Sequence, residues 1–304
     1  MGVIAPASAP PEPRALAQSL EKLAELGFKP RLGKNARARN GFLAGTDRER
    51  AADVMEMFRD KSIRAIFCVR GGYGTARLLE LLDYKLIEKH PKIFIGYSDI
   101  TSLHCAFLKR AGLVTFHGPM LNSDINKPDF PVFALESMLG VLTQAKAYGS
   151  IRAGCPTSNA RILRRGKASG RLIGGNLSIL CATMGTPDQP SFKDKILFLE
   201  DLDEAPYRFD RMLTHLRNAG LLQQLAGVAI GVNANCEDPK AAAAREFRQS
   251  LEDVLLDRLL PLKIPVVSGL PFGHVPMNAT LPVGVNVALD AVKGDLLITE
   301  AAVA

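Results

Sequence analysis

The stretch KIFIGYSDITSLH (residues 92–104) places a serine between two segments of different hydrophobic periodicity. Residues 93–95 are a continuous apolar run, which predicts a short buried strand, and residues 100–108 carry apolar side chains at helical spacing. Ser98 therefore lies at a strand-to-helix corner. A hydroxyl there can cap the helix, or it can be a nucleophile held out for attack. The residues alone favour the cap, because Ile100 stands where a G-x-S-x-G nucleophile motif needs its second glycine.

Strand-like and helix-like segments alternate on both sides of this corner. Residues 3–5, 65–69 and 113–116 are predicted strands, and residues 14–26 and 47–58 are predicted amphipathic helices. Such alternation is typical of βαβ units, so we expect an α/β fold whose N-terminal sheet is doubly wound and mostly parallel, of the flavodoxin or amidotransferase kind. Ligands bind such sheets at the loops beyond the carboxyl ends of the strands. Here those loops are residues 70–74, 96–99 and 117–119.

The periodicity weakens in the middle of the chain and resumes after it. We expect an N-terminal α/β domain at residues 1–145, a linker at residues 146–160, and a C-terminal mixed α/β domain at residues 161–304. The elements predicted in the C-terminal domain are strands at residues 196–201, 227–232 and 264–270, helices at residues 208–218 and 241–260, and a strand-rich tail.

The composition is that of an ordinary globular protein, with 47% hydrophobic and 23% charged residues among 304. The net charge of +7 comes from scattered basic residues, which argues against nucleic acid. It suits an anionic small substrate, but surface charge that only keeps the protein soluble is the favoured explanation. The five cysteines form no C-x-x-C pair, so we expect neither a zinc site nor disulfides, and a reducing compartment. No signal peptide or membrane span is predicted, which makes a cytoplasmic enzyme or binding protein the default.

Several other loops carry residues suited to a site. Paired glycines in RGGYG (residues 70–74) let the backbone approach a ligand, or they simply make a tight turn. Glu200 ends an apolar strand, where it can orient a histidine or join surface ion pairs. Of the five histidines, His274 in the loop GLPFGH is the best placed for proton transfer, and His117 is second. Asn176 in IGGNL is the predicted N-cap of a helix.

These stretches together resemble one family. IAPAS, RGGYG, GYSDIT, HGP, IGGNL, LED followed by E-x-P-Y-x-x-D-R, and GLPFGH occur in this order in the LD-carboxypeptidases (muramoyltetrapeptide carboxypeptidases). The resemblance extends over nearly the whole chain. It implies a two-domain α/β serine peptidase that needs no cofactor or metal. Such enzymes release the terminal D-alanine from the L,D bond of murein tetrapeptides during peptidoglycan recycling in the cytoplasm.

The resemblance also assigns roles by position. It implies that Ser98 is the nucleophile, Glu200 the triad acid and His274 the base, which overturns the capping interpretation of Ser98. It places the oxyanion donors at the backbone N–H groups of Asp99 and of the Gly71–Gly72 pair.

The motifs give less support to the residues that bind substrate and to the partners of the protein. We expect an anionic muropeptide as the substrate, with Arg70 as an anchor for its carboxylate, or else in a surface ion pair. His117 and Asn176 are further candidates for substrate binding. We expect neither nucleic acid nor a membrane as a partner, and a homodimer is compatible with the sequence.

Three alternatives remain open at this point. The same family includes immunity peptidases that cleave microcin C-type peptidyl nucleotides, which carry a tryptophan in the site, and this chain has none. A non-catalytic protein that binds a small ligand would leave Glu200 and His274 apart in the fold. A nucleotide-binding protein would use RGGYG for phosphate, but it lacks the third glycine and the lysine of the known motifs.

Overall fold

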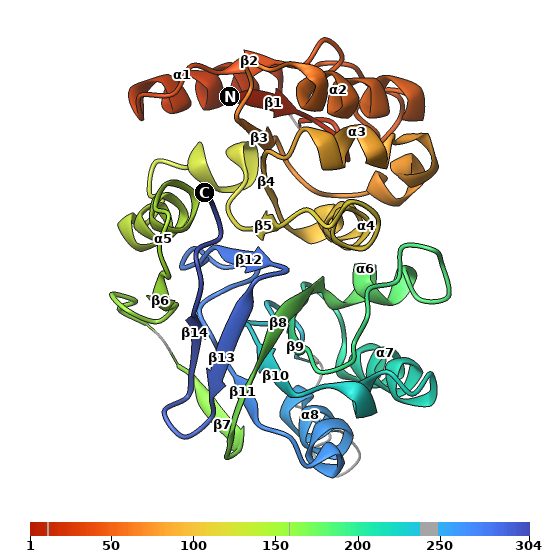
Figure 1. The fold of residues 1–304 in the computed structure, drawn as a ribbon, viewed down its shortest axis with the longest axis vertical. Coiled ribbons are helices and arrows are strands. Elements are labelled where there is room, and N and C mark those ends of the chain that lie inside the picture. The colour runs from red at the N-terminus through yellow and green to blue at the C-terminus, as the bar shows by residue number, and fades with distance from the viewer. Residues whose placement is uncertain (11, 158, 238–248) are drawn as a thin grey trace.

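A computed structural model describes residues 1–10, 12–157, 159–237 and 249–304 and contains two mixed sheets (Figure 1). The first sheet has the strand order β12-β5-β4-β3-β1-β2. Its strands from β1 to β5 are parallel neighbours in the order 2-1-3-4-5, which is the flavodoxin-like order. The bounds are β1 Gly2–Ile4, β2 Arg31–Leu32, β3 Ala65–Cys68, β4 Ile93–Gly96, β5 Thr115–His117 and β12 Leu281–Val283.

Helices cover this first sheet, and their termini follow local sequence rules. Thr46 and Glu49 form a reciprocal capping box at the start of α2, as the sequence favours. The RGGYG loop leads into the short 3₁₀ helix η1, Thr75–Leu81. The α-helices are α1 Pro13–Glu25, α2 Asp47–Arg59, α3 Tyr84–Lys89, α4 Thr101–Ala111 and α5 Val132–Thr143, with a 3₁₀ turn η2 Ser98–Ile100 and a π-helix η3 Leu121–Ile125.

The second sheet has eight strands in the order β6-β14-β13-β8-β9-β10-β11-β7. Its centre, from β8 to β11, is parallel, and antiparallel strands flank it on both sides. The strands are β6 Gly149–Ser150, β7 Arg161–Arg164, β8 Lys167–Asn176, β9 Ile196–Glu200, β10 Gly227–Ile230, β11 Val266–Ser268, β13 Asn286–Asp290 and β14 Asp295–Ile298.

Few helices accompany this sheet in the described chain. They are α6 Leu177–Ala182, α7 Pro206–Asn218 and α8 Leu251–Leu259, with 3₁₀ turns η4 Leu222–Gln224 and η6 Leu260–Leu262. Of the helix expected at residues 241–260, residues 241–248 lie outside the described residues, and α8 begins only at Leu251, after the N-cap Ser250.

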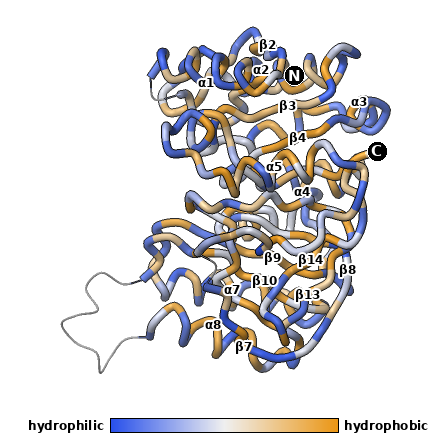
Figure 2. Tube along the Cα trace, turned by 90° about the vertical axis from the view of Figure 1, so that its left-hand side faces the viewer, coloured by the Kyte–Doolittle hydropathy of each residue, from blue (hydrophilic) through white to orange (hydrophobic). Residues whose placement is uncertain are grey.

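The two halves are joined by more than the covalent connection. Strand β12, drawn in blue between the halves in Figure 1, leaves the C-terminal part of the chain and pairs antiparallel with β5. One cluster of buried side chains continues from Val3 and Phe116 to Phe198 and Phe272. Figure 2 shows strands such as β10 at the hydrophobic end of the colour scale. The expected domain boundaries at residues 145 and 161 stay a prediction.

Within the described residues, no helix combines the length and the hydropathy that a membrane span requires.

Candidate active site

Ser98 occupies a strained position at the carboxyl end of β4. Its φ is +64°, a left-handed conformation that is costly for a residue with a Cβ and that is found at functional turns. The hydroxyl does not cap a helix: η2 begins at Ser98 itself, and Tyr97 is the residue in the capping position. Ser98 is partly exposed, and its side chain makes no hydrogen bond within the described residues. A strained, partly exposed serine at a strand-to-helix turn is the geometry of a nucleophile elbow.

Glu200 and His274 meet although 74 residues separate them. Glu200 is the last residue of β9 and is fully buried, and its Oε2 lies 2.6 Å from Nδ1 of His274. Gly273 makes this approach feasible, because its φ is +116° and a Cβ there would lie 3.1 Å from the Cβ of Glu200. The Gly273 N–H also donates to Oδ1 of Asn278, which fixes the loop. The alternative in which Glu200 and His274 lie apart is therefore wrong.

Charge and burial act in opposite directions on the pKa values of Glu200 and His274. Burial lowers the pKa of His274, but the hydrogen bond and charge of Glu200, with Asp201 and Asp124, raise it, and the net change is upward. Burial raises the pKa of Glu200, while the hydrogen bond from His274 opposes that rise. Oε1 of Glu200 has no partner within the described residues, so His274 is its main source of stabilisation. Because Nδ1 faces the carboxylate, we assign the proton to Nδ1, which leaves Nε2 as the basic nitrogen.

The serine turn and the histidine loop lie side by side. The ring of Tyr97, the residue before Ser98, lies edge-on to the His274 imidazole with 4.9 Å between the centroids. Within the described residues, Ser98 Oγ and His274 make no hydrogen bond, which is common for catalytic groups without a substrate. The structure thus joins Glu200 to His274 and brings His274 next to the turn that carries Ser98.

The RGGYG loop packs directly against the serine. A Cβ on Gly71 would lie 2.9 Å from the Cβ and 3.2 Å from the Oγ of Ser98. Gly72 has a φ of +110°, and the next residue, Tyr73, donates its N–H to Oγ of Ser8 at 3.1 Å. The loop therefore needs glycine at both positions to bring its backbone within reach of the serine oxygen.

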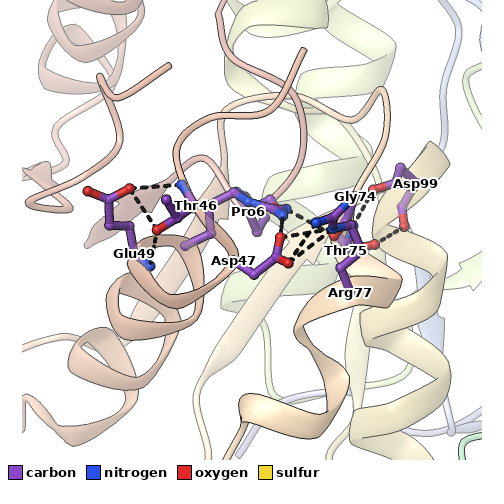
Figure 3. Close-up of polar contacts among 9 residues, drawn as sticks. Pro6, Thr46, Asp47, Glu49, Gly74, Thr75, Arg77 and Asp99 are labelled. Carbon is purple, nitrogen blue, oxygen red and sulfur yellow. Dashed lines mark hydrogen bonds and ion pairs between the residues drawn. The ribbon is translucent and has the colours of Figure 1, made fainter. Parts of the chain in front are cut away.

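A polar network holds this loop to the serine turn, as Figure 3 shows for Thr75, Asp99 and their neighbours. The Asp99 carboxylate accepts the Thr75 N–H at 2.9 Å, and the Asp99 carbonyl accepts the Thr75 hydroxyl at 2.5 Å. The buried Arg50 donates to the carbonyls of Gly74 and Pro6 at 2.9 and 2.5 Å. Sequence reasoning missed Arg50, because only the tertiary structure brings these two carbonyls to it.

The three residues expected to bind substrate lie in different environments. Arg70 is partly buried and its guanidinium is 3.5 Å from the Ala9 carbonyl, with no ion pair in the described part of the chain. Asn176 caps α6 as predicted and donates to Asp201 at 2.8 Å. His117 is fully buried beside Tyr97, Phe198 and Phe272, so substrate contact would require this packing to open.

The cavity next to the histidine loop and the question of a metal site both fall outside the Ser98, Glu200 and His274 group. A cavity of about 640 Å³ lies beside the histidine loop, lined by Val275, Pro276 and Asn233 among others, but Ser98, Glu200 and His274 are not among its lining residues. No group of three or more His, Cys, Asp or Glu side chains suited to a metal ion occurs among the residues that the structure describes.

Comparison with known proteins gives the same picture for both halves. Residues 1–118 match the model of the LD-carboxypeptidase N-terminal domain, and residues 169–289 match that of the LD-carboxypeptidase C-terminal domain. A probable murein peptide carboxypeptidase of Bacillus subtilis is 43% identical over 98% of this chain and 91% of its own length. The murein tetrapeptide carboxypeptidase of Pseudomonas aeruginosa is 32% identical over 95% of this chain and 92% of its own.

Solved structures are similar over the full length. The muramoyltetrapeptide carboxypeptidase of Oxalobacter formigenes superposes with a TM-score of 0.85 at 31% identity, covering 97% of this chain and 96% of that one. The microcin C7 self-immunity protein MccF, in complex with aspartyl sulfamoyl adenosine, gives a TM-score of 0.88 at 28% identity, covering 100% and 96%. The MccF sequence from Escherichia coli is 30% identical over 93% of this chain and 87% of its own length.

Proposed function

The chain belongs to the LD-carboxypeptidase family and is a serine-type carboxypeptidase, and we propose that it releases the terminal D-alanine from the L,D bond of murein tetrapeptides. The hydrogen bond of 2.6 Å between the buried Glu200 and His274, beside the turn that carries Ser98, is the observation that supports this most directly. Relatives named murein peptide and murein tetrapeptide carboxypeptidase support the substrate class.

The proposed mechanism uses these three side chains. Nε2 of His274 removes the hydroxyl proton as Oγ of Ser98 attacks the carbonyl carbon of the L,D bond. Glu200 stays ionised and stabilises the imidazolium. The N–H groups of Asp99 and of the Gly71–Gly72 pair are the proposed donors to the tetrahedral oxyanion.

The intermediate then collapses. The C–N bond breaks, the imidazolium gives its proton to the departing D-alanine amine, and the acyl group remains on Ser98. A water molecule then attacks the ester by the same sequence, with His274 again acting as the base, and restores the serine hydroxyl.

Replacement of the serine tests this proposal. Ser98→Ala should lower the release of D-alanine from a purified tetrapeptide by about 10⁴- to 10⁶-fold, measured by mass spectrometry of the digest. Ser102→Ala is a matched control, because Ser102 lies one helical turn away and its buried Oγ has no hydrogen-bond partner in the described structure. The control should retain turnover. A Ser98→Ala enzyme that cleaves at nearly the wild-type rate would remove the nucleophile assignment.

A peptidyl-nucleotide hydrolase is the second candidate. It is supported by the similarity to MccF, whose structure with aspartyl sulfamoyl adenosine superposes on this whole chain. The absence of tryptophan from the sequence favours the murein substrate over this one. Parallel digests of a murein tetrapeptide and an aspartyl sulfamoyl adenosine-type substrate separate the two, since the preferred class should show the higher kcat/KM.

The cellular setting is proposed on chemical grounds. The cysteines in the described structure are free thiols, which suits the reducing cytoplasm and a role in peptidoglycan recycling.

Arg70 remains the proposed anchor for the carboxylate of the anionic muropeptide, because it leads into the loop that contacts Ser98 and has no anionic partner among the described residues. A homodimer remains a proposal that sedimentation of the purified protein would test.

A further inference from the structure

His274 has a second neighbour that the proposed triad does not use. The ring of Tyr97 packs against the imidazole at 4.9 Å between centroids and an interplanar angle of 61°. Tyr97 is 4% exposed and directly precedes Ser98 in the chain. Tyr97 therefore contacts the proposed base through its ring and is joined to the proposed nucleophile, Ser98, by a peptide bond.

The hydroxyl of Tyr97 is held by a buried acid. It donates to Oδ1 of Asp124 at 3.2 Å, while Oδ2 of Asp124 accepts the N–H of Met120 at 2.9 Å. Asp124 is 7% exposed and lies in the π-helix Leu121–Ile125 that follows β5. Both carboxylate oxygens accept hydrogen bonds, which is the pattern of an ionised acid. Single π-helical turns are frequently located at functional sites.

We propose that Asp124, acting through Tyr97, is a second positioning acid for His274, which fixes the plane of the imidazole and stabilises its protonated form alongside Glu200. The inference rests on the proposed function, because it assigns a task to these residues within the same reaction. Glu200 bonds to one edge of the imidazole, and Tyr97 packs against the ring as a second support. Contacts from both β9 and the serine turn hold the imidazole in one orientation, which keeps its Nε2 aligned for proton transfer.

The charges around His274 come from several elements. Glu200 and Asp201 face it from the end of β9, Asp124 from the π-helix, and the neutral His117 from β5. Burial lowers the pKa of His274, whereas the three acids raise it. Burial raises the pKa of Asp124, and the Met120 N–H, Lys127, Tyr97 and His274 oppose that rise. In its ionised form, Asp124 adds a third negative charge that favours the imidazolium.

The pH profile of kcat/KM tests the proposal. The base must be neutral to remove the serine proton, so activity falls on the acid side as His274 becomes protonated. Asp124→Asn removes the charge but keeps a side chain of the same shape. The acid limb should therefore move to lower pH by about half a pH unit, because the imidazolium has lost a stabilising charge. Asp129→Asn is the matched control, since it removes an exposed acid from the same segment and should leave the limb in place.

A second measurement makes the result independent of turnover. The NMR titration of the His274 ring, assigned by comparison with His274→Asn, should show the same downward change in the Asp124→Asn protein. If wild type cleaves no tetrapeptide, the proposed function fails, while this titration still decides the role of Asp124. An unchanged titration and an unchanged acid limb would mean that Asp124 only supports the fold.

Tyr97→Phe provides the decisive variant if Asp124→Asn does not fold. It keeps the ring against His274 and removes only the hydroxyl that Asp124 holds. We expect kcat to fall about tenfold with little change in KM, because the ring loses its anchor while substrate contacts remain. A Tyr97→Phe enzyme with wild-type kcat would overturn the proposal.

Discussion

His104 holds the strand from which the serine turn departs. It lies on α4, is fully buried, and has both ring nitrogens engaged: Nε2 is 2.8 Å from the Gly96 carbonyl and Nδ1 is 2.9 Å from Oγ1 of Thr115. Gly96 is the last residue of β4, two positions before Ser98. A neutral imidazole that donates at Nε2 and accepts at Nδ1 satisfies both contacts.

This histidine predicts a loss of stability in acid. Burial lowers the pKa of His104 from 6.5 to about 4. Between these values the unfolded chain binds a proton that the folded chain does not, so the free energy of unfolding falls as the pH falls. The contribution of His104 should be about 2 kcal/mol between pH 8 and pH 5. Urea unfolding at both pH values measures it as the difference between wild type and His104→Gln.

The control separates this histidine from the general effect of acid. His215 is exposed on α7, and His215→Gln should leave the pH dependence of the wild type unchanged. The buried His117, whose pKa is also lowered, contributes in the same direction in all three proteins and cancels in the comparison. Equal pH dependence in His104→Gln and wild type would contradict the assignment.

Residues of the site differ in how visible they are in the sequence. Ser98 and Glu200 could be located at the carboxyl ends of predicted strands, which parallel strands present at one edge, but their proposed roles came from the family motifs. His274 was found from its loop and its motif. Arg50 and Asp124 were not predicted, because their significance depends on carbonyl groups and a tyrosine that only the tertiary structure brings to them.

At the scale of elements, α2 is tied to the RGGYG loop through a buried cation. Arg50 is 1% exposed, donates to the carbonyls of Pro6 and Gly74, and pairs with Asp47 at the start of the same helix. Asp47 in turn bonds to Arg77 on η1 (Figure 3). The helix therefore supports the loop that packs on the serine, without itself reaching the site.

Removal of this cation should cost both stability and rate. Arg50→Met removes a buried guanidinium from the carbonyls of Pro6 and Gly74 and from Asp47, so we expect about 3 kcal/mol less free energy of unfolding. The loop should also lose its fixed position against Ser98, which lowers kcat more than it raises KM. Urea unfolding and steady-state kinetics on the same samples measure the two effects.

Arg77→Gln is the matched control for this network. Arg77 bonds to the same Asp47, but its side chain is 48% exposed, so its loss should cost less than about 1 kcal/mol. A similar loss for the two variants would show that surface charge, and not the buried carbonyl contacts, accounts for the effect of Arg50.

Element order was more predictable than element pairing. The predicted strands at residues 65–69 and 196–201 differ from β3 and β9 by only a residue at one end, because apolar runs bounded by polar residues are a local signal. The return of β12 to pair with β5 was not predicted, since the register Leu281↔His117 joins residues that no local pattern relates. The proline and the glycine of LPVG, residues 281–284, also favour a loop over a strand in isolation.

At the scale of the whole molecule, the site depends on contact between the two halves. Oγ1 of Thr101, on α4 just after the serine turn, accepts the N–H of Asn176 at 3.1 Å. Asn176 ends β8 and pairs in register with Glu200 on β9. The distance between the serine and the acid–base pair is therefore set where α4 meets the end of β8.

Gly175 is the position where this contact can be perturbed. Its φ is +141°, and a Cβ there would lie 2.5 Å from Oγ1 of Thr101. Gly175→Ala should push β8 away from α4 and carry Glu200 with it. Because a shift of about 1 Å in a catalytic group can cost 10²-fold, we expect kcat to fall about 10- to 100-fold. Steady-state kinetics on the tetrapeptide, with thermal unfolding of the same samples, measure this change.

Two further variants separate displacement from backbone strain. Gly220 follows α7 with a φ of +69° and has no atom within 4 Å of an added Cβ, so Gly220→Ala carries backbone strain away from the site and should keep its activity. In the double variant Thr101→Ala/Gly175→Ala, the nearest atoms, Oγ1 and Cγ2 of Thr101, are removed, which leaves only its Cβ at 3.1 Å. Its kcat should therefore exceed that of Gly175→Ala alone. Thr101→Ala alone measures the cost of losing the hydrogen bond from Asn176. If Thr101→Ala keeps its activity and the double variant is no faster than Gly175→Ala, the loss arises within β8 itself, and the junction with α4 does not set the geometry of the site.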